Sequence, residues 1–461
     1  MRVDGRASKG RGAPRSRRYP PGPRSSPYVN LVRYARDPLA FLTALAREYG
    51  DIARFSLPSG DYVLLNDPDL TKDVLVTNHR CFVKGRFYEE LKRLLGEGLL
   101  TSEGDSHHTQ RRLLQPLFRQ ECVTAYGGVM VDAAARTRDR WRDGAELDVS
   151  EEMMRLTLAV VAMALLDADV ESEAREVGEA VDAGMVAFDR FLLPFSHVLW
   201  KLPLPATRRF LGARERLDAL IYSLIADRRR EAGERPDLLS HLVRVQTEGG
   251  EIGMSERQVR DEVMTILLAG HETTAQALTW TWYLLARHPE IEAALEDELD
   301  DVLAGEPPSV ADLSRLSYTR MLLAESMRLF PPSWMVTRRA LVDHELGGHV
   351  VPAGSIIFIS QFVTHRDDRY FPNPLRFAPE RWADAAEPER KKFVYFPFGA
   401  GPRLCIGERF AWMEAILLLA TLAERWRLRL VPGQRVVPKP MVTLRPRYGL
   451  RMTATARHPM S

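Results

Sequence analysis

The chain has 461 residues, of which 45% are apolar and 27% charged, an ordinary composition for a globular protein, and this excludes disorder, collagen and coiled coil for the whole chain. Its 64 basic and 62 acidic residues give a net charge of +2, which argues against a nucleic-acid binder because such a protein carries a basic excess or stripe. No apolar run approaches the roughly 20 residues that span a bilayer, and three cysteines make no disulfide framework. We therefore expect a cytoplasmic protein without a membrane segment.

The first 30 residues differ in composition from the rest. An Arg-rich stretch leads into the Pro- and Gly-rich YPPGPRSSPY. Glycine and proline interrupt any amphipathic helix there, and no apolar segment follows the basic residues, so we predict a disordered basic tail and linker at residues 1–30. Residues 31–461 are predicted to form one large domain.

Helical patterns dominate the remaining chain, and strand signals are few. The apolar periodicity predicts helices at residues 37–49, 67–77, 112–118, 125–141, 151–166, 171–191, 208–232, 255–287, 289–303, 318–330 and 408–426. Strands are predicted at residues 52–55 with 62–65, 338–341 with 349–351, 355–360 and 442–451. The pattern predicts a mainly α protein whose small β region joins pieces that are distant in the sequence, and this favours one domain over several.

A glycine-rich loop around Cys405 carries the clearest chemical signal. The segment FPFGAGPRLCIGERF places Cys405 directly before the predicted helix at residues 408–426. Free backbone N–H groups and the positive end of the helix dipole favour a thiolate there, and Arg403 adds a cation two residues away. Such a loop suits a thiolate that ligates a metal, whereas a lone cysteine without these neighbours is most often a buried structural residue.

The predicted helix at residues 255–287 has polar residues at its centre, in ILLAGHETTAQ. At 1.5 Å per residue it is about 45 Å long, enough to cross a domain. The Thr273 hydroxyl can reach the carbonyl of residue 269 one turn back, which loosens the helix locally. Glu272 and Thr273 destabilise an apolar helix unless they are satisfied or functional, so they form either a proton relay or part of a solvated polar face.

Two further segments carry charged pairs. Glu325 and Arg328 in AESMRLFPP lie at i, i+3 on one helical face and can pair, as many surface residues do. In SHHTQRRLLQPLF, His107, Arg111 and Arg112 lie within about one helical turn, where they either bind an anion or are solvated. Neither segment identifies a function by itself.

Together these four segments, in this order, resemble the cytochrome P-450 family of haem-thiolate monooxygenases. Phe398, Gly401, Arg403, Cys405 and Gly407 fill the FxxGxRxCxG pattern of the family's haem loop. The resemblance extends from about residue 20 to the C-terminus, and the ordered set of motifs is far more specific than any one of them.

The other motifs of the family are also present. Residues 269–274, AGHETT, resemble the oxygen-activating segment of the family's central helix. Glu325 and Arg328 fill its ExxR motif, and Arg381 in FAPERW supplies the third member of its Glu–Arg–Arg triad. His107–Arg111 fits the HxxxR form of the helix that faces a haem propionate. The pattern also fits one residue later, but the first register places the paired arginines and LLQP where the family has them.

The resemblance implies a cytochrome P-450 fold with haem b between the long central helix and the cysteine loop. Cys405 would be the proximal iron ligand, and a thiolate ligand favours O–O cleavage by pushing electron density onto the iron. Thr273 and Glu272 would deliver protons during oxygen activation, while Glu325, Arg328 and Arg381 would be structural. The residues implied to contact haem are Cys405, Arg403, His107, Arg111, Arg338, Phe398, Gly401, Gly407, Ala269 and Gly270.

The resemblance also implies an external supply of electrons. We find no flavin or nicotinamide module, and GAGPRL lacks the GxGxxG spacing of a dinucleotide site. Electrons are therefore expected from NAD(P)H through a reductase and a separate ferredoxin or flavodoxin. Arg112, Lys391, Lys392 and Arg409 could dock such an acidic partner, although ordinary solvation explains them equally well. We expect a monomer that binds O2 and no nucleic acid.

The expected substrate pocket is almost entirely apolar or aromatic, with a lid at residues 186–204. This lining predicts a lipophilic substrate, with a terpene-like molecule favoured and a fatty acid next. Two alternatives with the same fold remain, a peroxide-dependent peroxygenase and a non-catalytic haem-binding protein, but retention of Glu272, Thr273 and Cys405 argues against both. The expected lining residues are Phe82, Phe87, Tyr88, Leu268, Trp334, Met335, Val336, Met441 and Val442.

Overall fold

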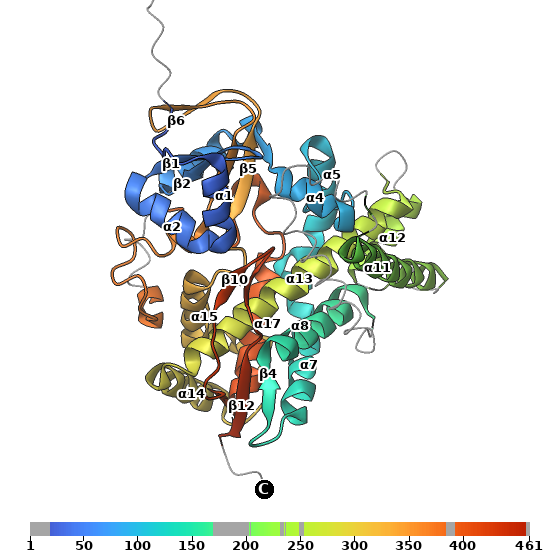
Figure 1. Ribbon diagram of the computed structural model, residues 1–461. Coiled ribbons are helices and arrows are strands. Elements are labelled where there is room, and N and C mark those ends of the chain that lie inside the picture. Colours follow the sequence, from blue (N-terminus) through green and yellow to red (C-terminus); the bar gives the residue numbers. More distant parts are fainter. Residues whose placement is uncertain are drawn as a thin grey trace, which may run out of the picture.

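The computed structural model describes residues 19–168, 202, 204–230, 235, 237–248, 253–383 and 392–457. Helices make up most of this part of the chain, and several small sheets accompany them (Figure 1). The predicted fold class, mainly α with a small β region, is confirmed. The predicted helix at residues 171–191 lies outside the described residues, as does almost all of the predicted lid at residues 186–204.

Helix α13 (Glu256–Leu285) crosses the middle of the molecule (Figure 1). It begins with a capping box, in which the Ser255 hydroxyl accepts the Gln258 N–H at 3.2 Å and the Gln258 side chain accepts the Ser255 N–H at 2.8 Å. Most of the helix is buried against its neighbours, so the polar residues at its centre face protein or an internal cavity rather than solvent. The helices packed around it are α8 (Val149–Leu166), α11 (Pro205–Arg230), α15 (Ser317–Leu329) and α17 (Glu408–Ala423).

The largest sheet joins pieces of chain that are far apart in the sequence. Its strand order is β1-β2-β8-β5-β3, with β2 parallel to β8 and the other neighbours antiparallel. The predicted pairing of residues 338–341 with 349–351 is wrong. The short loop through Gly347 and Gly348, both at positive φ, folds residues 349–351 back as a hairpin on the preceding strand. The strands concerned are β1 (Ile52–Leu57), β2 (Gly60–Leu65), β3 (Phe82–Lys84), β5 (Val336–Ala340), β6 (His344–Leu346), β7 (His349–Val351) and β8 (Ile356–Ile359).

The C-terminal part of the chain contributes two further sheets. The strand predicted at residues 442–451 is instead divided between β11 and β12, because Gly449 adopts a φ of 69° and turns the chain between them. Strand β11 (Leu444–Pro446) pairs with β10 (Pro438–Pro440) as a hairpin. The other sheet has the order β4-β12-β9, with β4 (Glu146–Asp148), β9 (Trp426–Leu430) and β12 (Arg451–Ala456).

Several helices differ from prediction in their bounds or were not predicted. Helix α5 (Gly104–Leu114) begins eight residues before the predicted start at residue 112, because its sequence GDSHHTQRRLL is mostly polar and gives little periodicity. A 3-10 turn at Gln115–Phe118 follows it. The helices that were not predicted are α1 (Pro27–Arg36), α4 (Arg86–Leu95), α6 (Gln120–Ala125), α12 (Leu238–Glu248) and α16 (Gln361–Thr364). The remaining helices are α2 (Pro38–Tyr49), α3 (Pro68–Lys72), α7 (Gly127–Arg140) and α14 (Pro289–Leu303), with a π-helical turn at Asp73–Thr77.

The described chain packs on the sheet before the predicted domain boundary at residue 31. The Arg54 N–H donates to the Pro21 carbonyl at 2.7 Å, and a Cβ on Gly22 would lie 1.7 Å from the Arg54 carbonyl oxygen. Helix α1 begins at Pro27, and its Asn30 side chain is completely buried. The segment 19–30 is therefore part of the packed structure, while residues 1–18 lie outside the described residues.

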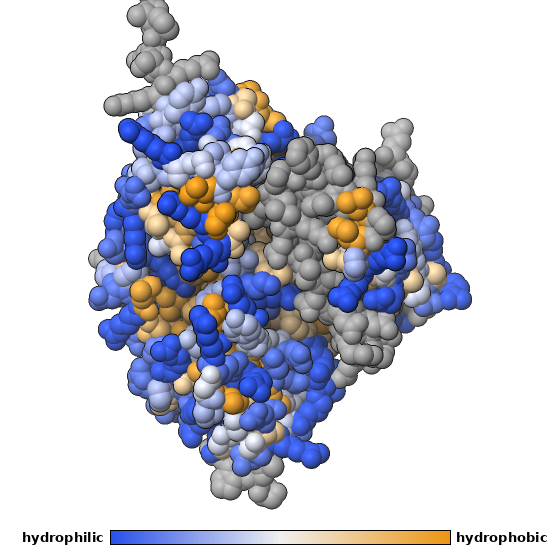
Figure 2. All heavy atoms as spheres, in the orientation of Figure 1, coloured by the Kyte–Doolittle hydropathy of each residue, from blue (hydrophilic) through white to orange (hydrophobic). Residues whose placement is uncertain are grey.

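The surface shown in Figure 2 is mostly hydrophilic, with apolar side chains in small separate groups. In the part of the chain that the structure describes, no helix is long and apolar enough to cross a membrane.

Candidate active site

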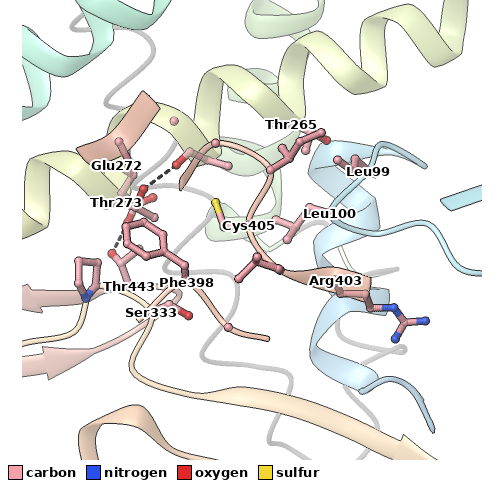
Figure 3. A pocket seen from close by; sticks show the side chains of 18 of the residues that line it. Leu99, Leu100, Thr265, Glu272, Thr273, Ser333, Phe398, Arg403, Cys405 and Thr443 are labelled. Carbon is pink, nitrogen blue, oxygen red and sulfur yellow. Dashed lines mark hydrogen bonds between the residues drawn. The ribbon is translucent and has the colours of Figure 1, made fainter. Parts of the chain in front are cut away.

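A cavity of about 390 Å³ lies between α13 and the loop that carries Cys405 (Figure 3). Its wall is mostly apolar, with polar groups gathered at two places. Most of the residues that the sequence suggested meet here, although they come from elements hundreds of residues apart. Those that line the cavity are His107, Arg111, Ala269, Gly270, Glu272, Thr273, Arg338, Phe398, Arg403, Cys405 and Gly407, together with Phe87, Tyr88, Leu268, Met335, Val336 and Val442.

The loop before α17 brings the Cys405 thiol to the cavity. Gly399 and Gly401 adopt φ of 75° and 73°, and a Cβ on Gly401 would lie 2.1 Å from the Leu75 carbonyl oxygen, so this glycine allows the loop to approach the π-helical turn. The Cys405 N–H donates to the Phe398 carbonyl at 3.0 Å and closes the loop. On the opposite wall, Ala269 of α13 is also open to the cavity, so space remains between the thiol and the helix.

The local groups expected to favour a Cys405 thiolate are present, but desolvation opposes them. Burial raises the pKa of the Cys405 thiol to about 11, and the backbone N–H of Gly407 and the charge of Arg111 only partly oppose this rise. Desolvation therefore outweighs the helix terminus. A coordinating metal ion deprotonates a thiol outright, so this thiol becomes a thiolate when it binds a metal.

Five basic side chains form a cluster at one side of the cavity. The Arg111 guanidinium donates to the Leu404 carbonyl at 2.8 Å, and Arg403 pairs with Glu103. Burial, with the nearby charges of Lys84 and Arg403, lowers the pKa of His107 to about 3, so its imidazole is neutral. Three arginines and a lysine outnumber the carboxylate of Glu103 that pairs with Arg403, so the cluster is positive and suited to anions. The cluster consists of Lys84, His107, Arg111, Arg338 and Arg403.

Lys84 belongs to this cluster and was missed by the sequence analysis. Its ammonium donates to the carbonyls of Leu99 at 3.1 Å and Ser102 at 2.7 Å. Burial, reinforced by the charge of Arg403, lowers the pKa of Lys84 to about 7. A signal for it was present, since the alternation in the strand Phe82–Lys84 places this lysine on the same side as a buried phenylalanine.

Three predicted pocket residues do not line the cavity. Phe82 packs into the apolar cluster of the large sheet, with its ring 5.0 Å from that of His344. Trp334 packs against the N-terminal helices, and its indole N–H donates to the Met441 carbonyl at 2.8 Å. Gly401, predicted to contact haem, also lies behind the lining and acts by letting the loop approach Leu75.

The centre of α13 supplies an acid and a hydroxyl to the cavity. The Thr273 hydroxyl donates to the Ala269 carbonyl at 2.9 Å, one turn back, as the sequence suggested. Glu272 does not face solvent; its carboxylate accepts hydrogen bonds from the Thr443 hydroxyl and from Arg445 Nε at 3.0 Å. Figure 3 shows Glu272, Thr273 and Thr443 together at the side of the cavity away from Arg403.

The structure brings Glu325, Arg328 and Arg381 together behind the Cys405 loop. The Glu325 carboxylate accepts from Arg328 at 2.8 Å and lies 3.3 Å from Arg381 Nε. Arg328 is completely buried and also donates to the carbonyls of His365 and Pro374, both at 2.7 Å. These contacts join α15 to the segment that leads into the cysteine loop, away from the cavity.

Another buried carboxyl, which the sequence analysis also missed, lies where α17 packs on α13. Glu414 of α17 is completely buried, and burial raises its pKa to about 8, with a partial offset from the Thr274 hydroxyl. Its carboxyl is therefore mostly protonated at neutral pH. The only sequence signal for Glu414 is that an acidic residue stands within a helix that is hydrophobic on all sides.

The cavity fits haem by its own chemistry. The thiol of Cys405 offers a soft ligand for iron, the basic cluster offers partners for two propionates, and the apolar walls suit a porphyrin. Each of these features comes from the arrangement of side chains in the structure, and together they match the group that the sequence motifs imply.

Comparisons with known proteins agree with this geometry. A family model described as Cytochrome P450 matches residues 20–452. The chain is 41% identical to cyclooctatin synthase of Streptomyces melanosporofaciens, over 89% of this chain and 90% of the relative. It is 38% identical to cyclooctat-9-en-7-ol 5-monooxygenase of the same organism, over 86% of each chain, and 37% identical to pentalenene oxygenase of Streptomyces avermitilis, over 92% of this chain and 94% of the relative.

The fold has a close counterpart among solved structures. The crystal structure of the cytochrome P450DA heme domain aligns with a TM-score of 0.85 and 26% sequence identity, and the alignment covers 96% of this chain and 99% of that one. The cysteine loop, the polar centre of α13 and the match along almost the whole chain lead to the same result: the chain belongs to the cytochrome P450 family and is a haem-dependent monooxygenase.

Proposed function

We propose that this enzyme inserts one oxygen atom from O2 into a lipophilic, terpene-like substrate, with haem b bound through Cys405 and with electrons from a separate ferredoxin or flavodoxin. The observation that carries the proposal is the cavity itself, in which a thiol on one wall faces an acid and a hydroxyl on the other while the rest of the lining is apolar. NAD(P)H, through a reductase, is the proposed source of the electrons.

The proposed role of each polar group follows from its position. Haem, when bound, supplies the oxygen chemistry. Cys405 holds its iron, and the basic cluster binds its propionates by charge-assisted hydrogen bonds. Thr273 and Glu272, on the wall opposite Cys405, move protons, since one oxygen atom of O2 enters the product and the other leaves as water. Beside them Ala269 presents only a methyl group to the cavity, while Gly270 lets α13 pack closely on Val161 of α8.

The apolar part of the lining supports a substrate without a charged group. Helix α4 and the residues after it contribute one wall, and α13 contributes the other. Most charged groups of the described lining belong to the basic cluster. Glu272 also lines the cavity, and it is paired with Arg445, which lies behind the lining. Relatives named for oxygenation of cyclooctat-9-en-7-ol and of pentalenene agree with this chemistry. The apolar residues of these walls include Leu91, Leu94, Leu95, Leu99, Leu100, Leu165, Ile266 and Leu268.

The visible spectrum tests whether Cys405 is the iron ligand. The purified, dithionite-reduced protein is expected to give the long-wavelength Soret band of a thiolate–haem–CO complex, and Cys405→Ser is expected to lose both this band and monooxygenation. The matched control is Cys122→Ser, on α6 outside the cavity, which should keep both. A short-wavelength band in the wild type would contradict Cys405 as the ligand and favour the non-catalytic alternative.

Binding spectra test the substrate class. A panel of sesquiterpenes and diterpenes is expected to shift the Soret band at lower concentrations than fatty acids of similar carbon number. The physical reason is that a fatty acid brings a carboxylate into a wall whose cations are already engaged by propionates. Tight binding of polar macrolides alone would overturn the lipophilic assignment.

The electron supply is tested separately. Exposed Arg112 of α5, Arg409 of α17 and Lys392 offer basic side chains for an acidic partner, while Lys391 lies outside the described residues. Product formation is expected with NAD(P)H, reductase and ferredoxin. Equal turnover with hydrogen peroxide and no partner would favour the peroxygenase alternative, against which the retained Glu272 and Thr273 argue.

A further inference from the structure

The C-terminal hairpin β10–β11 contacts the reactive centre of α13. Its connecting residues carry Val442 and Thr443 to the cavity wall, and Arg445 follows two residues later. Two indole N–H groups hold this hairpin in place: Trp334 donates to the Met441 carbonyl and Trp280 to the Leu444 carbonyl, both at 2.8 Å. The hairpin is therefore a firmly anchored element.

Glu272 is held by this hairpin through one of its two oxygens. The Thr443 hydroxyl donates to Oε1, as does Arg445 Nε at 3.0 Å, and Arg445 Nη2 lies 2.8 Å from the same oxygen. Figure 3 shows the bond between Glu272 and Thr443 at the edge of the cavity. Within the described residues the hydrogen bonds to this carboxylate all reach Oε1, and the Glu272 side chain lines the cavity.

A buried carboxylate at this position needs such partners. Glu272 is only 4% exposed, and an unpaired charge with so little contact to water is strongly unfavourable. A guanidinium and a hydroxyl directed at one oxygen compensate the charge and also fix the rotation of the carboxylate plane. These two donors flank Leu444 and follow Val442, so the hairpin that lines the cavity also holds the acid.

We propose that Thr443 and Arg445 are positioning residues for proton delivery. They bind Glu272 Oε1 and so present Oε2 to the cavity, where it takes a proton from water and passes it on beside Thr273. This rests on the proposed function, in which two electrons from the redox partner and two protons convert one oxygen atom of O2 into water while the other enters the substrate.

Variants of the two donors test the proposal against a matched control. Arg445→Gln and the near-isosteric Thr443→Val remove one partner each, and Arg445→Lys keeps the charge. Arg447→Gln removes an exposed arginine from the same segment and serves as the control. The readouts are the fraction of electrons that appears as hydrogen peroxide instead of product, kcat, the substrate Kd from the Soret shift, and the thiolate–haem–CO band.

We expect Arg445→Gln to lower kcat roughly tenfold, a part of the 100-fold or more that general acid–base catalysis contributes, and to release several times more peroxide. The substrate Kd and the CO band should stay unchanged, because neither the apolar wall nor Cys405 is altered. Arg445→Lys should recover most of the coupling, and Arg447→Gln should behave as wild type. Normal coupling in both Arg445→Gln and Thr443→Val would overturn the proposal.

A double-mutant cycle that combines Glu272→Gln with Arg445→Gln measures the same contact through thermal stability, without turnover. Arg445→Gln should lower the Tm by roughly 3–5 °C because it leaves a buried carboxylate without its cation, and adding Glu272→Gln should restore most of this loss. In the Glu272→Gln background, Arg445→Gln should cause no further peroxide release. Additive effects in both measurements would contradict action through Glu272. Failure of the proposed function would appear differently, as a wild type without a thiolate–CO band or product.

Discussion

Lys84 is a residue whose protonation state would change when an anionic ligand binds beside it. Its ammonium lies among other cations, with two backbone carbonyls as its hydrogen-bond acceptors. Burial and the charge of Arg403 lower its pKa to about 7, although a free lysine has a pKa near 10.5. A propionate brought into this cluster would favour the protonated form, because opposite charges at close range stabilise each other.

This linkage predicts that haem affinity depends on pH through Lys84. Below pH 7 the lysine is already protonated, whereas above pH 7 haem binding must also take up a proton. The affinity of the apoprotein for haem should therefore fall above pH 7, approaching about tenfold per pH unit. Lys84→Met should bind haem more weakly at pH 7 and lose this dependence. Haem transfer to apomyoglobin, followed from pH 6 to 9, measures both.

Lys72→Met removes an exposed lysine of α3 and should keep the wild-type pH dependence. An unchanged fall of affinity in Lys84→Met would instead assign the proton uptake to another group of the cluster.

At the scale of one element, the cysteine loop depends on the backbone of two glycines with different surroundings. Gly399 and Gly401 share a positive φ, but only Gly401 has a backbone neighbour where a Cβ would lie, the Leu75 carbonyl oxygen. A Cβ at positive φ is unfavourable by about 1–2 kcal/mol, and at residue 401 the clash adds to this. The loop can then approach Leu75 only by moving Cys405.

Gly401→Ala should therefore reduce haem retention and lower the Tm well beyond the effect of Gly399→Ala. For Gly399→Ala the expected drop is roughly 1–2 °C, with a normal CO band. Haem content per chain after gel filtration and thermal unfolding compare the two variants. If both variants retained haem equally, the close approach to Leu75 would not matter for the site.

The parts of the site that could be predicted from the sequence are the local motifs, whereas contacts between distant residues could not be predicted. The residues around Cys405 and Thr273 could be identified because each motif lies within a few consecutive positions of the sequence. Arg445 and Thr443 could not, since their contact with Glu272 joins positions 173 and 171 residues apart. Helix α4, 10 residues long, supplies much of the apolar wall, and it was not predicted although its apolar residues lie on one face.

At the scale of the whole molecule, the site is held by elements from every part of the chain. The N-terminal strands β1 and β2 share a sheet with β8 and β5, and β5 carries Arg338 to the cavity. The long helix α13 packs on α8, α15 and α17. The arrangement of the anion-binding cluster therefore depends on the sheet, and the sheet depends in turn on the N-terminal segment that covers β1.

The packed structure of the chain begins before residue 31. Removal of residues 1–18 should leave the Tm and haem content unchanged, whereas removal of residues 1–30 should lower the Tm by roughly 2–4 °C. The longer deletion removes the Pro21 carbonyl that accepts the Arg54 N–H at 2.7 Å and the buried Asn30, whose side chain donates to the Ser56 carbonyl at 3.0 Å. Both partners lie on β1, so its outer edge would lose its cover. Equal thermal unfolding of the two truncated proteins would place the boundary at residue 31, as the composition of the tail first suggested.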